Sequence, residues 1–253
     1  MSGFETLRYE KRDGVAVVTL CRPEAINAFN VRMRDELSEA LSAARADADV
    51  RGLLIAGDGE RGFCAGADLT EFGSAPSQAI ARYVRWARDL WTALAELPKP
   101  TMAAVHGYCF GSGLEIAALC DLRIASQDAV FALPEASLGL IPAAGGTQSL
   151  PRIVGLPRAM EMALTGRRMS SGEAVRAGFV DWLVPREQLH RVAEARLRDV
   201  VSAPAEALAL AKRAVNEGAD MTLADAASLP SPAMSVAYRS PATMAFGDAC
   251  RSG

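Results

Sequence analysis

Short runs of apolar residues, several of them rich in β-branched side chains, alternate with amphipathic segments along most of this 253-residue chain. The apolar runs predict buried strands at residues 15–20, 51–56, 101–105, 122–125 and 129–133. Helical spacing of apolar residues predicts helices at residues 30–46, 77–97 and 113–120. Strands that alternate with helices favour an α/β fold with parallel strand pairing.

Capping residues and prolines predict where several helices begin and end. Asn30 is the expected N-cap of the first helix, and Pro98 and Pro100 end the second. The pattern from Pro157 onward is mostly helical, with a short extended piece at residues 180–184 and a further helix at 205–216.

Composition limits the kind of protein. A length of 253 residues with 50% hydrophobic content fits one large domain, or one domain with an appendage. The net charge of −3 supplies no basic field for nucleic acid. Five cysteines without a CxxC pair favour reduced thiols in a cytoplasmic protein. The first residues form no apolar signal core, and the apolar runs are too short to span a membrane.

Two glutamates stand in apolar surroundings. Glu115 lies in a segment that is otherwise almost wholly apolar, and Glu135 follows the apolar run at residues 129–134. A carboxylate is rarely buried unless it is paired or hydrogen-bonded, because the loss of its water is costly. Both glutamates adjoin turns marked by glycine or proline, so they are candidates for a general acid and a general base.

Three segments rich in small residues could form a site around these glutamates. Residues 63–69 would let a ligand approach the backbone; the alternative is a tight turn in which Asp68 caps the next helix. Residues 107–115 place a glycine turn before a helix, where free N–H groups favour an anion; the alternative is a close-packed turn. Residues 134–147 form a long, mostly uncharged and glycine-rich segment that could contribute Glu135 to a site; the alternative is an ordered loop that leaves Glu135 exposed.

In order and spacing, these segments resemble the enoyl-CoA hydratase/isomerase (crotonase) superfamily. The resemblance covers residues 20–23, 27–30, 63–69, 107–121, 134–135 and 139–148. It implies a spiral of ββα units with the acyl-CoA site in residues 1–191. It also implies a helical oligomerisation region in residues 192–253, with assembly as a homotrimer or a dimer of trimers. The helices from about Val192 carry apolar faces that we expect to be exposed in an isolated spiral domain, as at an interface.

The resemblance further implies roles for individual residues. The backbone N–H groups of Ala67 and Ser112 would form an oxyanion hole, and Glu115 and Glu135 would catalyse the addition of water to a 2-enoyl-CoA in fatty acid metabolism. Substrate contacts are expected from Arg22, Ala25, Ala28, Ala65, Gly66, Asp68, Leu69, Gly111, Pro134 and Gly145. Residues 77–97 and 139–147 would line the pocket. No metal and no cofactor beyond the coenzyme A of the substrate is expected.

Two other functions remain open. The protein could be a double-bond isomerase or a related acyl-CoA enzyme, or it could be a catalytically weak acyl-CoA-binding protein. The C-terminus departs from the family pattern, because residues 245–253 carry no lysine–arginine cluster and follow two helix-breaking prolines. The phosphates of coenzyme A would then need another cation, and Arg22 is the expected one.

Overall fold

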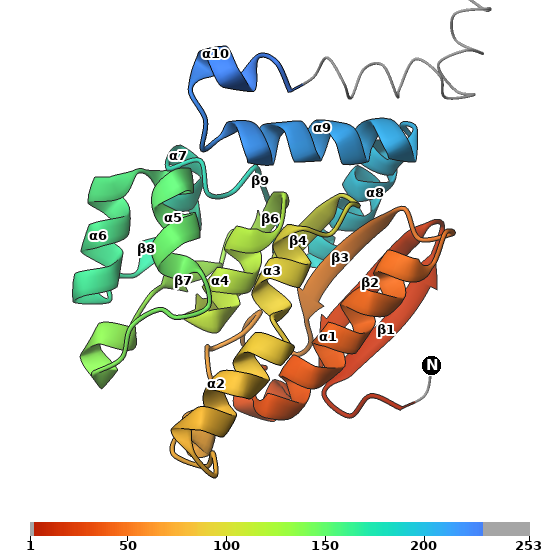
Figure 1. Cartoon of the computed structure of the whole chain (residues 1–253). Helices are drawn as coiled ribbons and strands as arrows, with labels where there is room; N and C mark the ends of the chain where they lie inside the picture. Colours follow the sequence, from red (N-terminus) through yellow and green to blue (C-terminus); the bar gives the residue numbers. More distant parts are fainter. Residues whose placement is uncertain (1–2, 230–253) are drawn as a thin grey trace, which may run out of the picture.

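The computed structural model describes residues 3–229, apart from the side chains of residues 81 and 85. Within these residues the chain forms a six-stranded sheet in the order β1-β2-β3-β4-β6-β9 (Figure 1). Its strands are β1 (Leu7–Arg12), β2 (Val15–Leu20), β3 (Gly52–Gly57), β4 (Thr101–Val105), β6 (Leu122–Ser126) and β9 (Trp182–Val184). Strand β1 is antiparallel to β2, and the other neighbours are parallel.

A second, three-stranded sheet contains β5 (Tyr108–Phe110), β7 (Val130–Ala132) and β8 (Met169–Ser170). Strand β4 of the large sheet leads into β5 of the small sheet, and helix α4 (Ser112–Leu119) follows. Strands β6 and β7 repeat the same step between the two sheets. The predicted α/β fold of ββα units is therefore confirmed.

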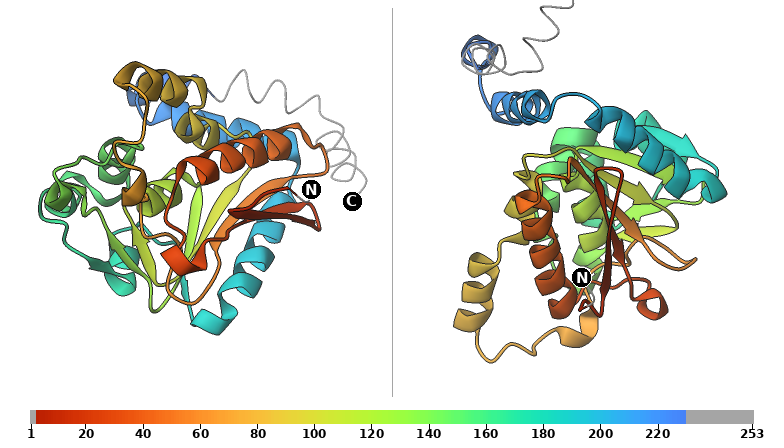
Figure 2. Two further views of the ribbon diagram at one scale, coloured as in Figure 1. Left: turned by 90° about the horizontal axis from the view of Figure 1, so that it is seen from below. Right: turned by 90° about the vertical axis from the view of Figure 1, so that its right-hand side faces the viewer.

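Helices cover both faces of the large sheet. Helices α1 (Val31–Ala46), α3 (Leu90–Ala95) and α4 contribute to the main apolar core on one face. Helix α8 (Leu189–Val201) packs on the other face through Leu189, Ala193, Leu197 and Val201. The two views of Figure 2 show α1 and α8 on opposite sides of the strands.

The structure corrects two expectations. The single helix predicted over 77–97 is two helices, α2 (Gln78–Ala87) and α3, because the Asp89 side chain accepts a hydrogen bond from the Thr92 N–H and caps a new helix. Strands β1, β5 and β8 were not predicted, because the sequence of β1, LRYEKR, is largely polar and the other two are only three and two residues long. The remaining predicted strands and helices are present, with ends shifted by one or a few residues.

Short helices complete the described chain. The α-helices are α5 (Gly146–Val154), α6 (Leu156–Thr165), α7 (Ser171–Arg176), α9 (Ala205–Gly218) and α10 (Leu223–Ala226). The 3-10 helices are η1 (Pro23–Ala25), η2 (Leu69–Glu71), η3 (Glu135–Leu138) and η4 (Arg186–Gln188). Among residues 3–229, no helix combines the length and the apolar character needed to cross a membrane.

The C-terminal helices α8 and α9 differ in how much of their surface is buried. Helix α8 begins just before the expected boundary at residue 192 and buries its apolar face in its own chain, contrary to the expectation that this face would be exposed. Helix α9 has no buried residue, and Val215 and Leu223 are 71% and 87% exposed. The proline-broken segment and the atypical tail predicted beyond residue 229 lie outside the described residues.

One buried polar side chain joins the end of β2 to the loop after β3. Asn27 is fully buried with a φ of 54°, a conformation that asparagine tolerates better than most residues. Its amide nitrogen donates to the carbonyl oxygens of Asp58, Gly62 and Phe63, and its oxygen accepts the Arg22 N–H at 2.8 Å. Asn27 therefore anchors the segment that leads into residues 64–68.

We expect Asn27→Ala to lower the free energy of unfolding by roughly 3 kcal/mol or more, because several buried backbone groups would lose their partner. Asn30→Ala removes only the cap on the Met33 N–H and should cost about 1 kcal/mol. Urea denaturation of both variants measures the difference. Equal losses would show that the Asn27 network contributes no more than an ordinary helix cap.

Candidate active site

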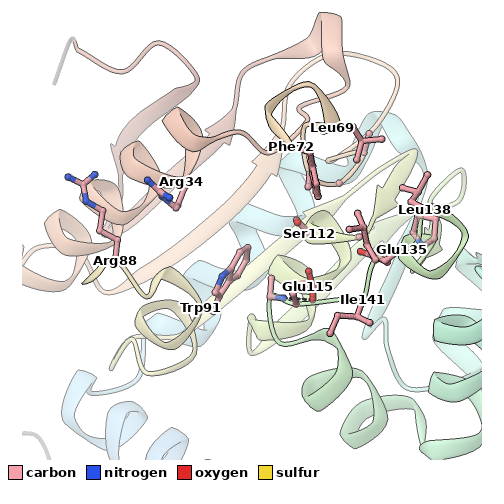
Figure 3. Close-up of a pocket in the computed structure, with 18 residues that line it drawn as sticks. Arg34, Leu69, Phe72, Arg88, Trp91, Ser112, Glu115, Glu135, Leu138 and Ile141 are labelled. Atoms are coloured by element: carbon pink, nitrogen blue, oxygen red, sulfur yellow. Dashed lines mark hydrogen bonds between the residues drawn. The ribbon is translucent and has the colours of Figure 1, made fainter. Parts of the chain in front are cut away.

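A cavity of about 500 Å³ opens between helices α1, α3 and α4 and the loop before α5. Its walls are mostly apolar, with four charged residues among them (Figure 3). The lining residues are Arg34, Ala65, Gly66, Ala67, Leu69, Phe72, Arg88, Trp91, Gly111, Ser112, Glu115, Pro134, Glu135, Leu138, Leu140, Ile141, Ala143 and Ala144. Its size and mixed lining suit a small organic ligand.

The segment before η2 leaves one backbone N–H without a hydrogen-bond acceptor at Ala67, a residue that lines this cavity. Asp68 donates its N–H to the Phe29 carbonyl at 2.9 Å, and the Gly66 carbonyl accepts the Phe29 N–H at 2.8 Å. Successive N–H groups of extended chain point in opposite directions, so the Ala67 N–H turns away from Phe29. It donates to none of the described residues and is available to a ligand.

A second free N–H lies at the start of α4. Gly111 precedes the helix with φ 48° and ψ −121°, a conformation open essentially to glycine alone. The Ser112 N–H has no hydrogen-bond acceptor among residues 3–229, as is usual for the first residue of a helix. A Cβ on Gly111 would lie 3.5 Å from the Gly66 Cα, so the two turns are in contact. Ala67 and Ser112 thus border one cavity, and neither N–H group has an acceptor among residues 3–229.

Glu115 lies one turn into α4, on the same side of the helix as Ser112. It is 2% exposed, and its Oε1 accepts hydrogen bonds from the N–H groups of Ala144 and Gly146, both at 2.8 Å. Hydrogen bonds to a carboxylate oxygen favour its ionised form. They also fix the loop before α5 against α4, so the buried carboxylate has a defined position.

Glu135 begins η3 and points into the same cavity (Figure 3). Its Oε2 is buried and has no hydrogen-bond partner among the described residues. Burial raises the pKa of Glu135 above its usual 4.5, and the negative charge of Glu115 raises it further. A carboxyl group in this setting tends to hold a proton and is suited to donate it.

Most of the predicted site residues converge on the cavity. Ala65, Gly66, Ala67, Leu69, Gly111, Ser112, Glu115, Pro134 and Glu135 all line it. The other five predicted residues, Arg22, Ala25, Ala28, Asp68 and Gly145, lie outside its lining. The Arg22 guanidinium donates to the Ala28 carbonyl at 2.6 Å and to the Asp68 carboxylate at 2.9 Å, so these three form a separate cluster.

Several lining residues were not singled out from the sequence. Arg88 and Trp91 belong to the 77–97 segment that was expected to line the pocket, but neither residue was predicted to contact a ligand. Arg34 and Phe72 were not anticipated at all. Arg34 is one turn beyond the Asn30 cap, and no local pattern shows that this face of the helix meets a cavity. Within residues 3–229, no cluster of histidine, cysteine and acidic residues could hold a metal ion.

Comparison with known proteins agrees with this geometry. The enoyl-CoA hydratase/isomerase family profile matches residues 10–236. A probable enoyl-CoA hydratase of Rhizobium meliloti is 40% identical over 222 residues, which cover 88% of this chain and 85% of that protein. The mitochondrial enoyl-CoA hydratase of Pongo abelii is 39% identical over 231 residues, covering 90% of this chain and 79% of that protein.

A solved structure extends the similarity to three dimensions. The enoyl-CoA hydratase of Bacillus anthracis matches with a TM-score of 0.92 at 31% identity, over 98% of this chain and 96% of that chain. The fold is therefore the α/β crotonase fold. The chain belongs to the enoyl-CoA hydratase/isomerase family.

The protonation of Glu135 can be tested directly. We expect the pKa of Glu135 to lie above 4.5 and to fall in Glu115→Gln, because that variant removes the neighbouring negative charge. A carbon-13 titration of the glutamate carboxyl signals, assigned by comparison with Glu135→Gln, measures both values.

The same shift affects stability. The pKa of Glu135 is higher in the folded protein than in the unfolded chain, so protonated Glu135 contributes to stability below pH 4.5. This contribution is lost as the pH rises from 4.5 through the pKa of the folded protein. Over that pH range the free energy of unfolding of the parent should fall relative to that of Glu135→Gln. A Glu135 pKa at or below 4.5 would contradict this account.

Proposed function

We propose that this protein is an enoyl-CoA hydratase, which adds water across the double bond of a 2-enoyl-CoA thioester. The observation that supports this most is that two carboxyl groups, Glu115 and Glu135, and two free N–H groups border a single cavity. Names of relatives such as the Rhizobium meliloti protein point to the same substrate class.

The two N–H groups would act on the thioester. The carbonyl oxygen would accept hydrogen bonds from Ala67 and Ser112, and negative charge would collect on it as the β-carbon is attacked. Donors that are already in place need no rearrangement at that moment, and each contributes roughly two to three powers of ten in rate. The dipole of helix α4, which begins at Ser112, would add to this stabilisation.

The two carboxyl groups would divide the proton transfers. The ionised Glu115, held by two backbone N–H groups, would accept a proton from water while the water oxygen bonds to the β-carbon. Glu135, whose raised pKa favours the protonated form, would donate its proton to the α-carbon. Transfer of one proton from Glu115 to Glu135 would restore the starting state. The reaction involves no net oxidation or reduction, so we propose no cofactor beyond the coenzyme A of the substrate.

Coenzyme A would extend from the cavity past η1. We propose that Arg22 meets its phosphates with Ala25 and Ala28 alongside, although Asp68 already neutralises part of the Arg22 charge.

We also propose that the chain assembles as a trimer or a dimer of trimers through its C-terminal helices. The exposed Val215 on α9 and Leu223 on α10 support this, since apolar side chains at a surface often mark an interface.

Glu115→Gln and Glu135→Gln should each slow the hydration of crotonyl-CoA by roughly two to four powers of ten, because glutamine keeps the shape but cannot transfer the proton. The loss of ultraviolet absorbance of the conjugated thioester measures the rate. Glu187→Gln, at an exposed position in η4, is the matched control and should retain the parent rate.

Three results would contradict the assignment. Parent-like rates in both active-site variants would exclude the proposed roles of the carboxyl groups. A parent protein that converts a 3-enoyl-CoA to the 2-enoyl isomer, but never hydrates either, would be an isomerase. Binding of acyl-CoA without any turnover would indicate a catalytically weak acyl-CoA-binding protein.

A further inference from the structure

Two arginines line the cavity in addition to the two glutamates. Arg34 comes from the first turns of α1, and Arg88 is the C-cap of α2. No step of the proposed hydration uses them. Because a guanidinium remains charged at all ordinary pH values, these side chains bring a permanent positive charge to an otherwise apolar wall.

One carboxylate is shared between the two arginines. Asp35 Oδ1 lies 2.8 Å from an Arg34 nitrogen and 2.8 Å from an Arg88 nitrogen. Of the other acids nearby, Asp68 pairs with Arg22, and Glu71 accepts the Val31 N–H but keeps its negative charge beside Arg34. Asp35 contacts Nε and Nη2 of Arg34 and Nη1 of Arg88, which leaves further N–H donors on both guanidiniums for a ligand.

The arginines lie apart from the reacting groups. Figure 3 shows Arg34 and Arg88 on one side of the cavity, with Trp91 between them and Glu115, and with Glu135 on the far side. Trp91 and Phe72 give the intervening wall an aromatic surface. An acyl chain whose thioester lies at Ala67 and Ser112 would cross this surface before it meets a guanidinium.

We propose that Arg34 and Arg88 select a 2-enoyl-CoA whose acyl chain ends in a carboxylate. The proposal rests on the proposed hydratase function and names the substrate class. A carboxylate matches the planar N–H donors of arginine, and the aromatic wall suits the short carbon chain before it. The ionised Glu115 repels a carboxylate from the other end of the cavity, so charge helps to orient the substrate.

An apolar chain end would fit this position less well. It would displace water from two guanidiniums without replacing the lost hydrogen bonds, which is unfavourable for a charged group. Arg34 is only 22% exposed, so the effect should be greater at Arg34 than at Arg88, which is 52% exposed.

The preference can be measured by binding. We expect the parent protein to bind 4-carboxybutanoyl-CoA at least about tenfold more tightly than pentanoyl-CoA in calorimetric titrations, the range for hydrogen bonds to a charged group. Arg34→Gln and Arg88→Gln should each reduce this ratio by roughly three- to tenfold. Arg45→Gln, also on α1 but outside the cavity lining, is the control and should keep the parent ratio.

Hydration of the matching unsaturated pair, 4-carboxybut-2-enoyl-CoA and pent-2-enoyl-CoA, separates this proposal from the proposed function. Equal binding of the saturated pair, or a ratio unchanged in both cavity variants, would overturn the arginine proposal even if both enoyl substrates are hydrated. A preference that the variants abolish, without hydration of either substrate, would support the arginine site and contradict the hydratase.

Discussion

The site depends on the close backbone approach of two chain segments, residues 62–66 and residues 107–113. A Cβ on Gly62 would lie 2.5 Å from the Tyr108 backbone nitrogen, and one on Gly113 would lie 2.5 Å from the Cys64 carbonyl oxygen. Such distances are well inside van der Waals contact, so any side chain at these positions would force the backbones apart. The contact brings the Ala67 N–H and the start of α4 to the same cavity.

Electrostatics then gives the two carboxyl groups different character. Glu115 is buried but receives two backbone N–H groups, which stabilise its charge. Glu135 has a buried oxygen without a hydrogen-bond partner in the described chain, and it faces the charge of Glu115. One environment therefore favours a carboxylate and the other a carboxylic acid, the division of roles that water addition needs.

Local sequence patterns predicted a large part of this structure. The apolar run at β2 and the Asn30 cap of α1 act within a few residues, so they can be recognised without tertiary information. The same rules missed β1, whose polar sequence hides its pairing, and the helix break at Asp89. At Asp89 an apolar pattern was given more weight than a local polar cap, whereas β1 carries no run of apolar residues that would have marked it as a strand.

The site was partly predictable for a related reason. Glu115 and Glu135 stood out because a charge in an apolar segment needs a partner or a function. The N–H donors of Ala67 and Ser112 followed from small-residue turns together with the family resemblance. Arg34 could not be found in this way, because its position at the cavity depends on how α1 meets the junction between α2 and α3. That is a property of packing, which a single sequence does not display.

The central claim is that this cavity adds water to a 2-enoyl-CoA, and isotope transfer tests it most directly. The protein would be incubated with crotonyl-CoA in oxygen-18 water, and the acyl products would be analysed by mass spectrometry. We predict a 3-hydroxyacyl-CoA with one oxygen-18 atom on the β-carbon. Recovery of unlabelled acyl-CoA alone, after prolonged incubation with protein shown to be folded, would contradict the account.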